Sequence, residues 1–295
     1  MNIRTKARAS LFPAVIAVSS ASIFVRLAAA PPIGAAFWRG AIAGLAFLPL
    51  IFIPRFRRQW RDISRRDLGI IAAATTVICV HQICFITSLS LTTVAASTFL
   101  TSTQPIFTAL LGGLLIREHV SARGWLAIAV ALGGMALISF SKTNGTGQSH
   151  ALLGNSLAVL AALLASLYTL SARRLRQRVP LVPFMFTVHV SGTIFLALIV
   201  GFTGTNLGHY SPQTWLGLLL LGLIPTFIGH SLLTYAVGHL RAFVVNASIL
   251  GEPVGATIMA ALFLHEAAPW QTIIGGLIII AAVLFIIFER EAHAA

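Results

Sequence analysis

The sequence predicts an all-α integral membrane protein with ten transmembrane helices in two inverted five-helix repeats. Hydrophobic residues make up 57% of the chain and the mean hydropathy is +0.92. Charged residues make up only 9%, whereas a soluble domain has about 25%. Apolar runs long enough to cross a bilayer recur along the whole chain, and a few rare residues recur half a chain apart.

Windows of about 20 apolar residues divide the chain into ten expected spans. The first resembles a secretory signal, but Arg26 interrupts it and another span follows directly, so we expect a retained helix. The run from Leu68 to Ile116 contains no Asp, Glu, Lys or Arg and is too long for one crossing, so we divide it at a polar turn. The ten spans are approximately 11–30, 33–53, 69–88, 94–116, 124–141, 153–172, 183–202, 214–236, 242–264 and 270–288.

The distribution of Lys and Arg predicts how these spans are oriented. With a cytoplasmic N-terminus, 17 of the 20 basic residues fall in cytoplasmic segments, and Lys142 alone falls in an outside loop. This positive-inside bias predicts a multi-pass protein of the cytoplasmic (inner) membrane with both termini in the cytoplasm. It also accounts for the net charge of +13 without a nucleic-acid partner, because no basic face with interleaved aromatics is present.

Glu252 is the strongest functional candidate. It lies within the otherwise uncharged ninth span, and Pro253 follows it. A charge at bilayer depth costs roughly 2.5 to 3.5 kcal/mol and marks a functional site by default. The proline is expected to leave a carbonyl without its helical donor and to kink the span. We therefore expect Glu252 to bind substrate or to exchange protons; the alternative is a neutral glutamate that bonds the kinked backbone.

A shift of 148 residues relates the two halves. It places Gln104-Pro105 on Glu252-Pro253 and Glu118 on Glu266. Five identities over residues 67–134 are near chance, so the rare residues carry the comparison. We expect one five-helix repeat in residues 1–148 and another in 149–295. An odd number of spans inverts the second copy, which is the architecture of alternating access; the alternative is a pair of similar packing helices.

The motifs also resemble those of the EamA-like family of the drug/metabolite transporter superfamily. The resemblance covers nearly the whole chain and rests on Gly251-Glu252-Pro253, on Glu266 followed by Pro269-Trp270-Gln271, and on Phe37-Trp38-Arg39. It implies a bundle of two inverted five-helix repeats that carries small metabolites, often outward, without hydrolysing ATP. Gln104 departs from the pattern, since a glutamate would stand there if the first half copied the second.

Several other polar residues within the spans are candidates for the substrate path. Histidine changes charge near physiological pH and could bind substrate or relay protons, although a lone buried histidine is more often a neutral packing group. Arg39 could hold an anionic group or balance Glu252, or it could extend to the headgroups. Polar amides could line the same cavity or join helices. The candidates are Glu252, Gln104, His230, His81, Gln82, Arg39 and Asn246, with Pro105 and Pro253 as kink positions and His189 as a further buried histidine.

These observations predict a secondary transporter rather than an enzyme. The only lysines, Lys6 and Lys142, lack the glycines of an ATP-binding loop. His265-Glu266 lacks the second zinc-binding histidine because Pro269 stands there, so no metal or other cofactor is expected. We expect alternating-access transport of a small organic metabolite, such as an amino acid, nucleobase or drug-like compound, with proton-coupled export as one form. An intramembrane enzyme and a channel or receptor are the alternatives. The expected partners are this substrate and the lipid bilayer, and protons, another cation and a second copy of the chain stay open as partners.

Overall fold

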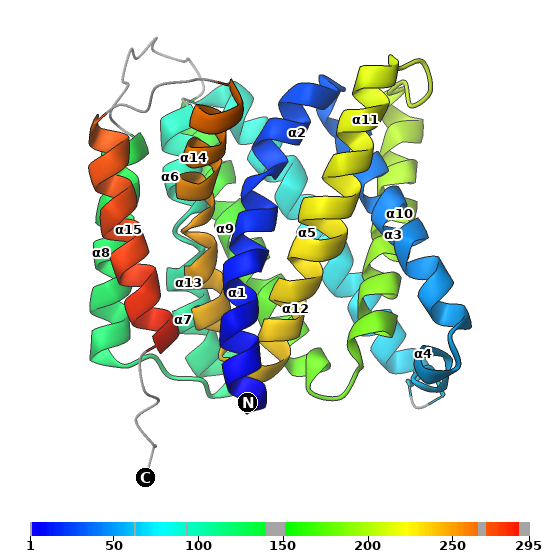
Figure 1. The fold of residues 1–295 in the computed structure, drawn as a ribbon, viewed down its shortest axis with the longest axis horizontal. Helices are drawn as coiled ribbons and strands as arrows, with labels where there is room; N and C mark the ends of the chain where they lie inside the picture. The colour runs from blue at the N-terminus through cyan, green and yellow to red at the C-terminus, as the bar shows by residue number, and fades with distance from the viewer. Residues whose placement is uncertain (1, 62, 93, 140–150, 265–269, 289–295) are drawn as a thin grey trace.

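The computed structural model describes residues 2–61, 63–92, 94–139, 151–264 and 270–288, and these residues form helices without strands (Figure 1). Lys142, Glu266, Pro269 and Arg290, on which the sequence expectations partly rest, lie outside the described residues. The helices of the first half are α1 (Ile3–Ser19), α2 (Ala21–Ala28), α3 (Pro32–Phe52), α4 (Pro54–Arg58), α5 (Arg65–Leu91), α6 (Val94–Thr101), α7 (Gln104–Ile116) and α8 (Ala122–Ser139). Those of the second half are α9 (Ala151–Arg176), α10 (Leu181–Thr203), α11 (Pro212–Leu221), the π-helix η1 (Gly222–Gly229), α12 (His230–His239), α13 (Ala242–Ile249), α14 (Glu252–Leu264) and α15 (Trp270–Phe288).

The described chain contains nine helical stretches that are long and apolar enough to cross a membrane. They correspond to nine of the ten expected spans. The fifth expected span, 124–141, coincides with α8, whose apolar stretch of 122–137 is shorter than the others. The class expected from the sequence, an all-α integral membrane protein, is therefore confirmed, while the ten-span repeat count stays a prediction.

Local sequence signals explain where several helices begin. The side chain of Ser64 accepts a hydrogen bond from the backbone N–H of Asp67 at the start of α5, and Ser211 caps α11 in the same way. Pro32 and Pro212 each occupy the first residue of a helix. A proline costs nothing there, because the first N–H groups of a helix have no partner within it.

Two spans are interrupted near the middle, and both interruptions precede a proline. The helix stops at Ser102 and Thr103 in one span and at Leu250 and Gly251 in the other, and then restarts. Pro105 and Pro253 are the second residues of the new helices. The structure thus differs from the kinked continuous helix expected around Pro253. A restart places the proline in a first turn, where it displaces no hydrogen bond.

Most helix bounds recur at a spacing of 148 residues, and the others differ from it by a few residues. α6 and α7 have the same lengths as α13 and α14, and each begins 148 residues before its counterpart. The pair α1–α2 spans residues 3–28, and α9 spans 151–176. The offset found from Gln104-Pro105 and Glu252-Pro253 therefore also relates the secondary structure of the two halves.

Contacts between the halves follow the same pairing. α5 packs against α9, while α11, η1 and α12 pack against α1 and α2. The counterpart of α5 is the stretch from α11 to α12, and the counterpart of α9 is the pair α1–α2. The two contacts are therefore equivalent under the repeat. The counterparts α3 and α10 pack directly on each other, as do α8 and α15, and α7 packs on α13, the first segment of the span that corresponds to α6–α7. In Figure 1, α8 and α15 lie together at one edge of the bundle and α3 and α10 at the other.

The halves differ in two places. The stretch from α11 to α12 contains the π-helix η1 with Pro225 inside it, whereas its counterpart α5 is a continuous α-helix. The helix that begins at Ile3 is interrupted at Ser20, whereas its counterpart α9 is continuous. π-helical turns are rare and frequently lie at functional sites.

Candidate functional site

Arg39 of α3 reaches across to η1 and α12. Its Nε donates to Oγ1 of Thr226 over 3.1 Å, and its Nη2 lies 3.2 Å from Nε2 of His230. A guanidinium group can only donate, so the histidine Nε2 accepts and the ring proton belongs on Nδ1. Two of the five guanidinium N–H groups are used in this way, which leaves three to bind a ligand.

The local backbone explains this contact. A Cβ added at Gly222 would lie within 2.6 Å of the Ile42 side chain, so α3 approaches η1 closely there. The Thr226 hydroxyl also donates to the carbonyl of Leu221, five residues earlier, over 2.8 Å. That bond gives the Leu221 carbonyl a donor in the wide π-helical turn. The Oγ1 atom of Thr226 also accepts the hydrogen bond from Arg39.

Glu252 is the first residue of α14 and lies where α14 meets the end of α1. Its backbone carbonyl accepts a hydrogen bond of 3.1 Å from Ser19. The ion pairs found among the described residues are Arg173–Glu118 and Arg178–Asp67, so Glu252 and Arg39 are not in direct contact.

The three charged or titratable groups are accessible although they lie within spans. His230 is exposed, and Arg39 and Glu252 are partly exposed. Ionisable residues in spanning helices usually face a cavity or a partner rather than lipid. Arg39, Thr226 and His230 form a hydrogen-bonded cluster. We take this cluster together with Glu252 as the candidate site and call it the Arg39 site.

Aromatic side chains lie beside this site. Phe47 of α3 stacks on His189 of α10, with ring centroids 5.8 Å apart, and meets Phe227 of η1 edge-on at 4.6 Å. His189 is buried, and neither its Nε2 nor the Thr193 hydroxyl has a hydrogen-bond partner in the described structure. The Thr193 hydroxyl faces Gly40 of α3, and Gly44 of α3 packs on the Cβ and backbone of His189.

Two of the predicted site residues join helices instead. Nδ1 of His81 lies 2.7 Å from the carbonyl of Ala161, which ties α5 to α9. Asn246 is buried, donates to Thr108 over 2.5 Å and accepts from Thr169 over 3.0 Å. Its amide connects α13 to α7 and to α9 and is closed to solvent.

The first-half residues that correspond to Glu252 and His230 carry no charge. Gln104 and Gln82, which the 148-residue offset pairs with Glu252 and His230, are partly exposed. The carbonyl of Gln104 accepts a 2.9 Å hydrogen bond from Ser166 of α9. Pro105, the residue after Gln104, is buried, whereas Pro253 is partly exposed.

The structure thus brings Arg39 and His230 within hydrogen-bond distance and leaves Glu252 partly exposed at the start of α14, while His81 and Asn246 bond to other helices. Sequence reasoning missed Thr226, which links Arg39 to the π-helix. The available signal was Pro225 within a long apolar span, since a proline there must disturb the α-helical hydrogen bonds. No group of three or more His, Cys, Asp or Glu residues arranged as metal ligands occurs in the described ranges.

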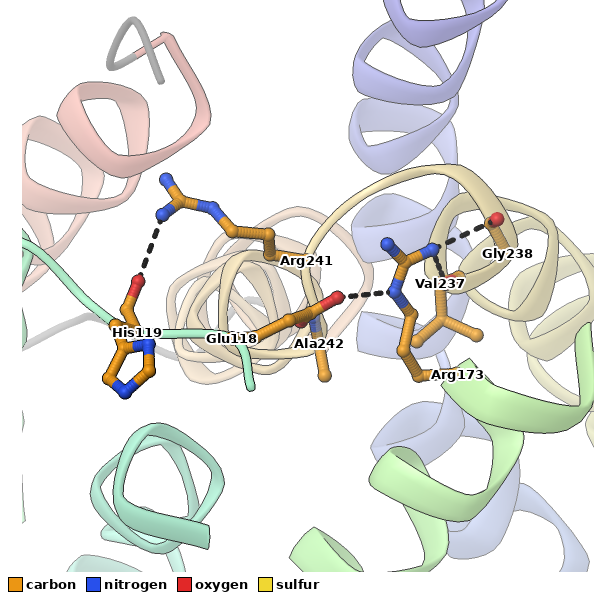
Figure 2. Close-up of polar contacts among 7 residues, drawn as sticks. All are labelled: Glu118, His119, Arg173, Val237, Gly238, Arg241 and Ala242. Carbon is orange, nitrogen blue, oxygen red and sulfur yellow. Dashed lines mark hydrogen bonds and ion pairs between the residues drawn. The ribbon is translucent and has the colours of Figure 1, made fainter. Parts of the chain in front are cut away.

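A second polar cluster ties the helices together at the end of the bundle that carries the N-terminus, and we call it the Glu118 network (Figure 2). Glu118, after α7, accepts from Nε of Arg173 over 2.7 Å and from the backbone N–H of Ala242 over 2.9 Å. Arg173 also donates to the carbonyls of Val237 and Gly238 at the end of α12, over 3.2 and 3.0 Å. The Glu118 carboxylate therefore joins the first half to α9 and α13, and Arg173 extends the network to α12.

Comparison with known sequences and structures gives a consistent result. The sequence profile of the EamA-like transporter family matches residues 8–140 and again residues 152–288. A solved structure, described as "Crystal structure of protein", has the same fold, with a TM-score of 0.78 and 17% identity over 96% of both chains.

Curated relatives are named as transporters. An uncharacterized transporter of Bacillus subtilis, YdfC, is 28% identical over 190 residues, which are 64% of this chain and 61% of that relative's length. YetK of the same organism, also named an uncharacterized transporter, is 24% identical over 86% of this chain and 77% of its own length. A probable terminal-alkyne amino-acid exporter of Streptantibioticus cattleyicolor is 26% identical over 64% of this chain and 63% of its own length.

Proposed function

Because the chain belongs to the EamA-like transporter family, we propose that it is a secondary transporter that moves a small zwitterionic metabolite, such as an amino acid, by alternating access. The family, the named relatives and the spanning helices make it a membrane transporter. The substrate class, the cytoplasmic membrane as its location and the mechanism are the proposal.

The observation that carries this proposal is the arrangement of Arg39 and Glu252. The two side chains carry opposite charge, each is partly exposed within a spanning helix, and no ion pair joins them. An amino acid could bridge them, with its carboxylate on the free N–H groups of Arg39 and its ammonium group on Glu252. Guanidinium groups suit carboxylates because they donate two parallel hydrogen bonds. The exporter from Streptantibioticus cattleyicolor, whose name gives an amino-acid substrate, agrees with this class.

The surroundings of the site favour an apolar or aromatic side chain on the substrate. Phe47 and Phe227 form an edge-to-face pair directly beside Thr226 and Arg39. Ligand sites commonly combine an apolar wall with a few convergent polar groups that fix orientation. Substrates with larger apolar side chains should therefore bind more tightly than glycine.

Three observations support alternating access between two inverted repeats. Helix bounds recur 148 residues apart, and the main contacts between the halves occur as exchangeable pairs. The family profile matches each half separately, over 8–140 and 152–288. Such repeats exchange roles as a midplane site opens first to one side and then to the other.

In such a cycle, the ion pair and hydrogen bonds of the Glu118 network have to break. It joins the α7–α8 connection to α9, α12 and α13 at one end of the bundle. We propose that the opening toward the other side of the membrane forms between the same helices, at the end of the bundle away from the Glu118 network. Opening toward the N-terminal end would then require Arg173 and the N–H of Ala242 to leave Glu118.

Counterflow in proteoliposomes tests the proposed function. Vesicles loaded with an unlabelled amino acid should accumulate the same labelled amino acid, and the matching amine and the matching carboxylic acid should compete poorly because each lacks one charge. Leucine, phenylalanine, glycine, adenine and a cationic dye form the test panel. Saturable exchange of adenine or dye without amino-acid exchange would reject the zwitterion, and non-saturable flux would indicate a channel.

A further inference from the structure

Two cavities open at the end of the bundle that carries the Glu118 network. They have volumes of about 500 and 630 Å³ and share Arg174 of α9. The first is lined by Leu114, Leu115, Ile116, Arg117, Glu118, Arg173, Arg174 and Gln177. The second is lined by Ser64, Arg66, Asp67, Ile70, Ser171, Arg174, Leu175 and Arg178.

Positive charge is in excess in these cavities. Each acidic residue already has an arginine partner, because Asp67 pairs with Arg178 at 2.6 Å and Glu118 pairs with Arg173 at 2.7 Å. Three arginines are left over, namely Arg66, Arg117 and Arg174. All three are exposed, and none is paired with an acid of the described chain.

The rim of the first cavity is apolar and belongs to a spanning helix. Leu114 of α7 is 79% exposed and Leu115 is 52% exposed, and Leu110, one turn earlier, is also exposed. Exposed leucines on a helix of this kind contact acyl chains, while arginines at its end reach the headgroup level. The arginines and the leucines therefore mark the two parts of one amphipathic ligand.

We propose that these cavities bind an anionic phospholipid, with its phosphate at Arg174, which both cavities share, and an acyl chain along Leu114 and Leu110. Arg117 in the first cavity and Arg66 in the second add positive charge on either side of Arg174. Basic pockets between spanning helices are suited to acidic headgroups. A soluble anion would use the arginines but leave the apolar rim unexplained. This site is separate from the Arg39 site, and it does not depend on which substrate is carried.

The location gives the lipid a role in holding one conformation. The first cavity is lined by Glu118 and Arg173, so a lipid phosphate at Arg174 would sit next to the ion pair of the Glu118 network. A ligand that binds one conformation better than another stabilises it by that difference in affinity. Anionic lipid should therefore raise the apparent melting temperature and favour the state in which Glu118 is bonded.

Thermal unfolding of the full chain in neutral detergent tests this site. Dioleoyl phosphatidylglycerol should raise the Tm in a saturable way, whereas dioleoyl phosphatidylcholine and inorganic phosphate should not. Replacing Arg66, Arg117 and Arg174 by Gln should weaken the apparent lipid affinity about fivefold for each charge removed, since each is worth about 1 kcal/mol. The control is the triple replacement of Arg55, Arg57 and Arg58 of α4 by Gln, which removes as much charge between α3 and α5 but outside the cavities.

Three results would overturn the proposal. They are equal Tm shifts from the two lipids, an unchanged phosphatidylglycerol affinity in the Arg66, Arg117 and Arg174 variant, and an equal loss in the α4 control. A Tm shift from inorganic phosphate that matches that of phosphatidylglycerol would replace the lipid by a soluble anion. If the triple variant does not fold, native mass spectrometry of Arg174→Gln decides, because the variant should retain fewer bound phosphatidylglycerol molecules than the wild type.

Discussion

The hydroxyl of Ser19 donates a 3.1 Å hydrogen bond to the backbone carbonyl of Glu252 and so ties the end of α1 to the start of α14. Ser166 of α9 makes the same contact with the carbonyl of Gln104 at the start of α7, over 2.9 Å. Both serines also bond the carbonyl four residues earlier in their own helix. One contact thus occurs twice, each time joining one half to the residue before the proline, Pro253 or Pro105, of the other.

Removing the charge of Arg39 should impair substrate binding. Arg39→Leu loses bonds to Thr226 and His230 and the group proposed to hold a carboxylate. Charge-assisted hydrogen bonds contribute about 1.5 to 3 kcal/mol, so amino-acid affinity should fall about 10- to 150-fold. Counterflow and thermal-shift titration measure this affinity. Arg57→Leu on exposed α4 is the matched control, and equal affinities in the two variants would remove Arg39 from the site.

Glu252→Gln should discriminate between substrates that carry an ammonium group and those that do not. The amide keeps the shape of Glu252 but cannot ionise, so binding of an amino acid should weaken while binding of its deaminated analogue should not. The counterpart variant Gln104→Glu should leave this selectivity as in the wild type, because Gln104 does not belong to the Arg39 site. Competition in the counterflow assay measures both. Equal losses for both substrates in Glu252→Gln would contradict an ammonium-binding role.

The same variant tests proton coupling. If Glu252 exchanges a proton in each cycle, the exchange rate of the wild type should depend on pH and that of Glu252→Gln should not. A parallel measurement at several pH values with equal pH on both sides separates this from a gradient effect. An identical pH profile in both proteins would leave Glu252 only a binding role.

Asn246→Ala should affect stability more than transport. The change removes bonds to Thr108 and Thr169, but both threonines keep bonds to their own helices. Hydrogen bonds between spanning helices average about 0.6 kcal/mol, so the free energy of unfolding should fall by about 1 kcal/mol. Thermal unfolding and the transport rate per folded molecule give the comparison. Lost transport at unchanged stability would place Asn246 in the substrate path.

The Glu118–Arg173 pair should be worth more than the Asp67–Arg178 pair at the same end. The side chains of the first pair are both 15% exposed, whereas Arg178 is 54% exposed. Exposed pairs contribute about 0.2 to 1 kcal/mol, and pairs that are less exposed to solvent and have additional backbone hydrogen bonds contribute more. Double-mutant cycles with Glu118→Gln and Arg173→Gln, and with Asp67→Asn and Arg178→Gln, measure both coupling energies. A larger coupling for Asp67–Arg178 would contradict this ranking.

Gly217→Ala should destabilise the bundle because α11 lies directly on α2. An added Cβ would overlap the backbone of Ala28, which cannot rotate away, and overpacking of this kind costs about 1 to 3 kcal/mol. Gly201→Ala is the matched control, since nothing lies within 4 Å of its Cβ position and alanine favours helix. Thermal unfolding should separate the two variants, and equal stability would show that α2 can shift.

Much of the fold followed from the sequence because membrane spans and rare residues leave strong signals. Glu252-Pro253 and Gln104-Pro105 identified the 148-residue offset that the helix bounds repeat. The breaks before these prolines were expected as kinks, because the sequence does not reveal whether a helix bends or restarts. The sequence did not show whether the Arg39 side chain extends to the headgroups or points into the bundle. Its hydrogen bonds to Thr226 and His230 show that it points into the bundle.

The parts of the site that could not be predicted depend on distant contacts or on irregular backbone. Asn246 looked like a lining residue, but its partners Thr108 and Thr169 come from two other helices. Thr226 owes its position to a π-helical turn, which changes the face on which a residue lies and has no periodic signature. The Glu118 network depends on where α9 and α12 end relative to each other.

The unlike halves have an energetic consequence for the proposed cycle. If the two repeats were identical, opening to either side would be equal in free energy and an idle protein would spend half its time in each orientation. Here one span carries η1 while its counterpart α5 is regular, and one is interrupted at Ser20 while α9 is not. Without a gradient or ligand, the resting protein should therefore favour one orientation. This bias should make the apparent substrate affinity of the protein differ between the two sides of the membrane.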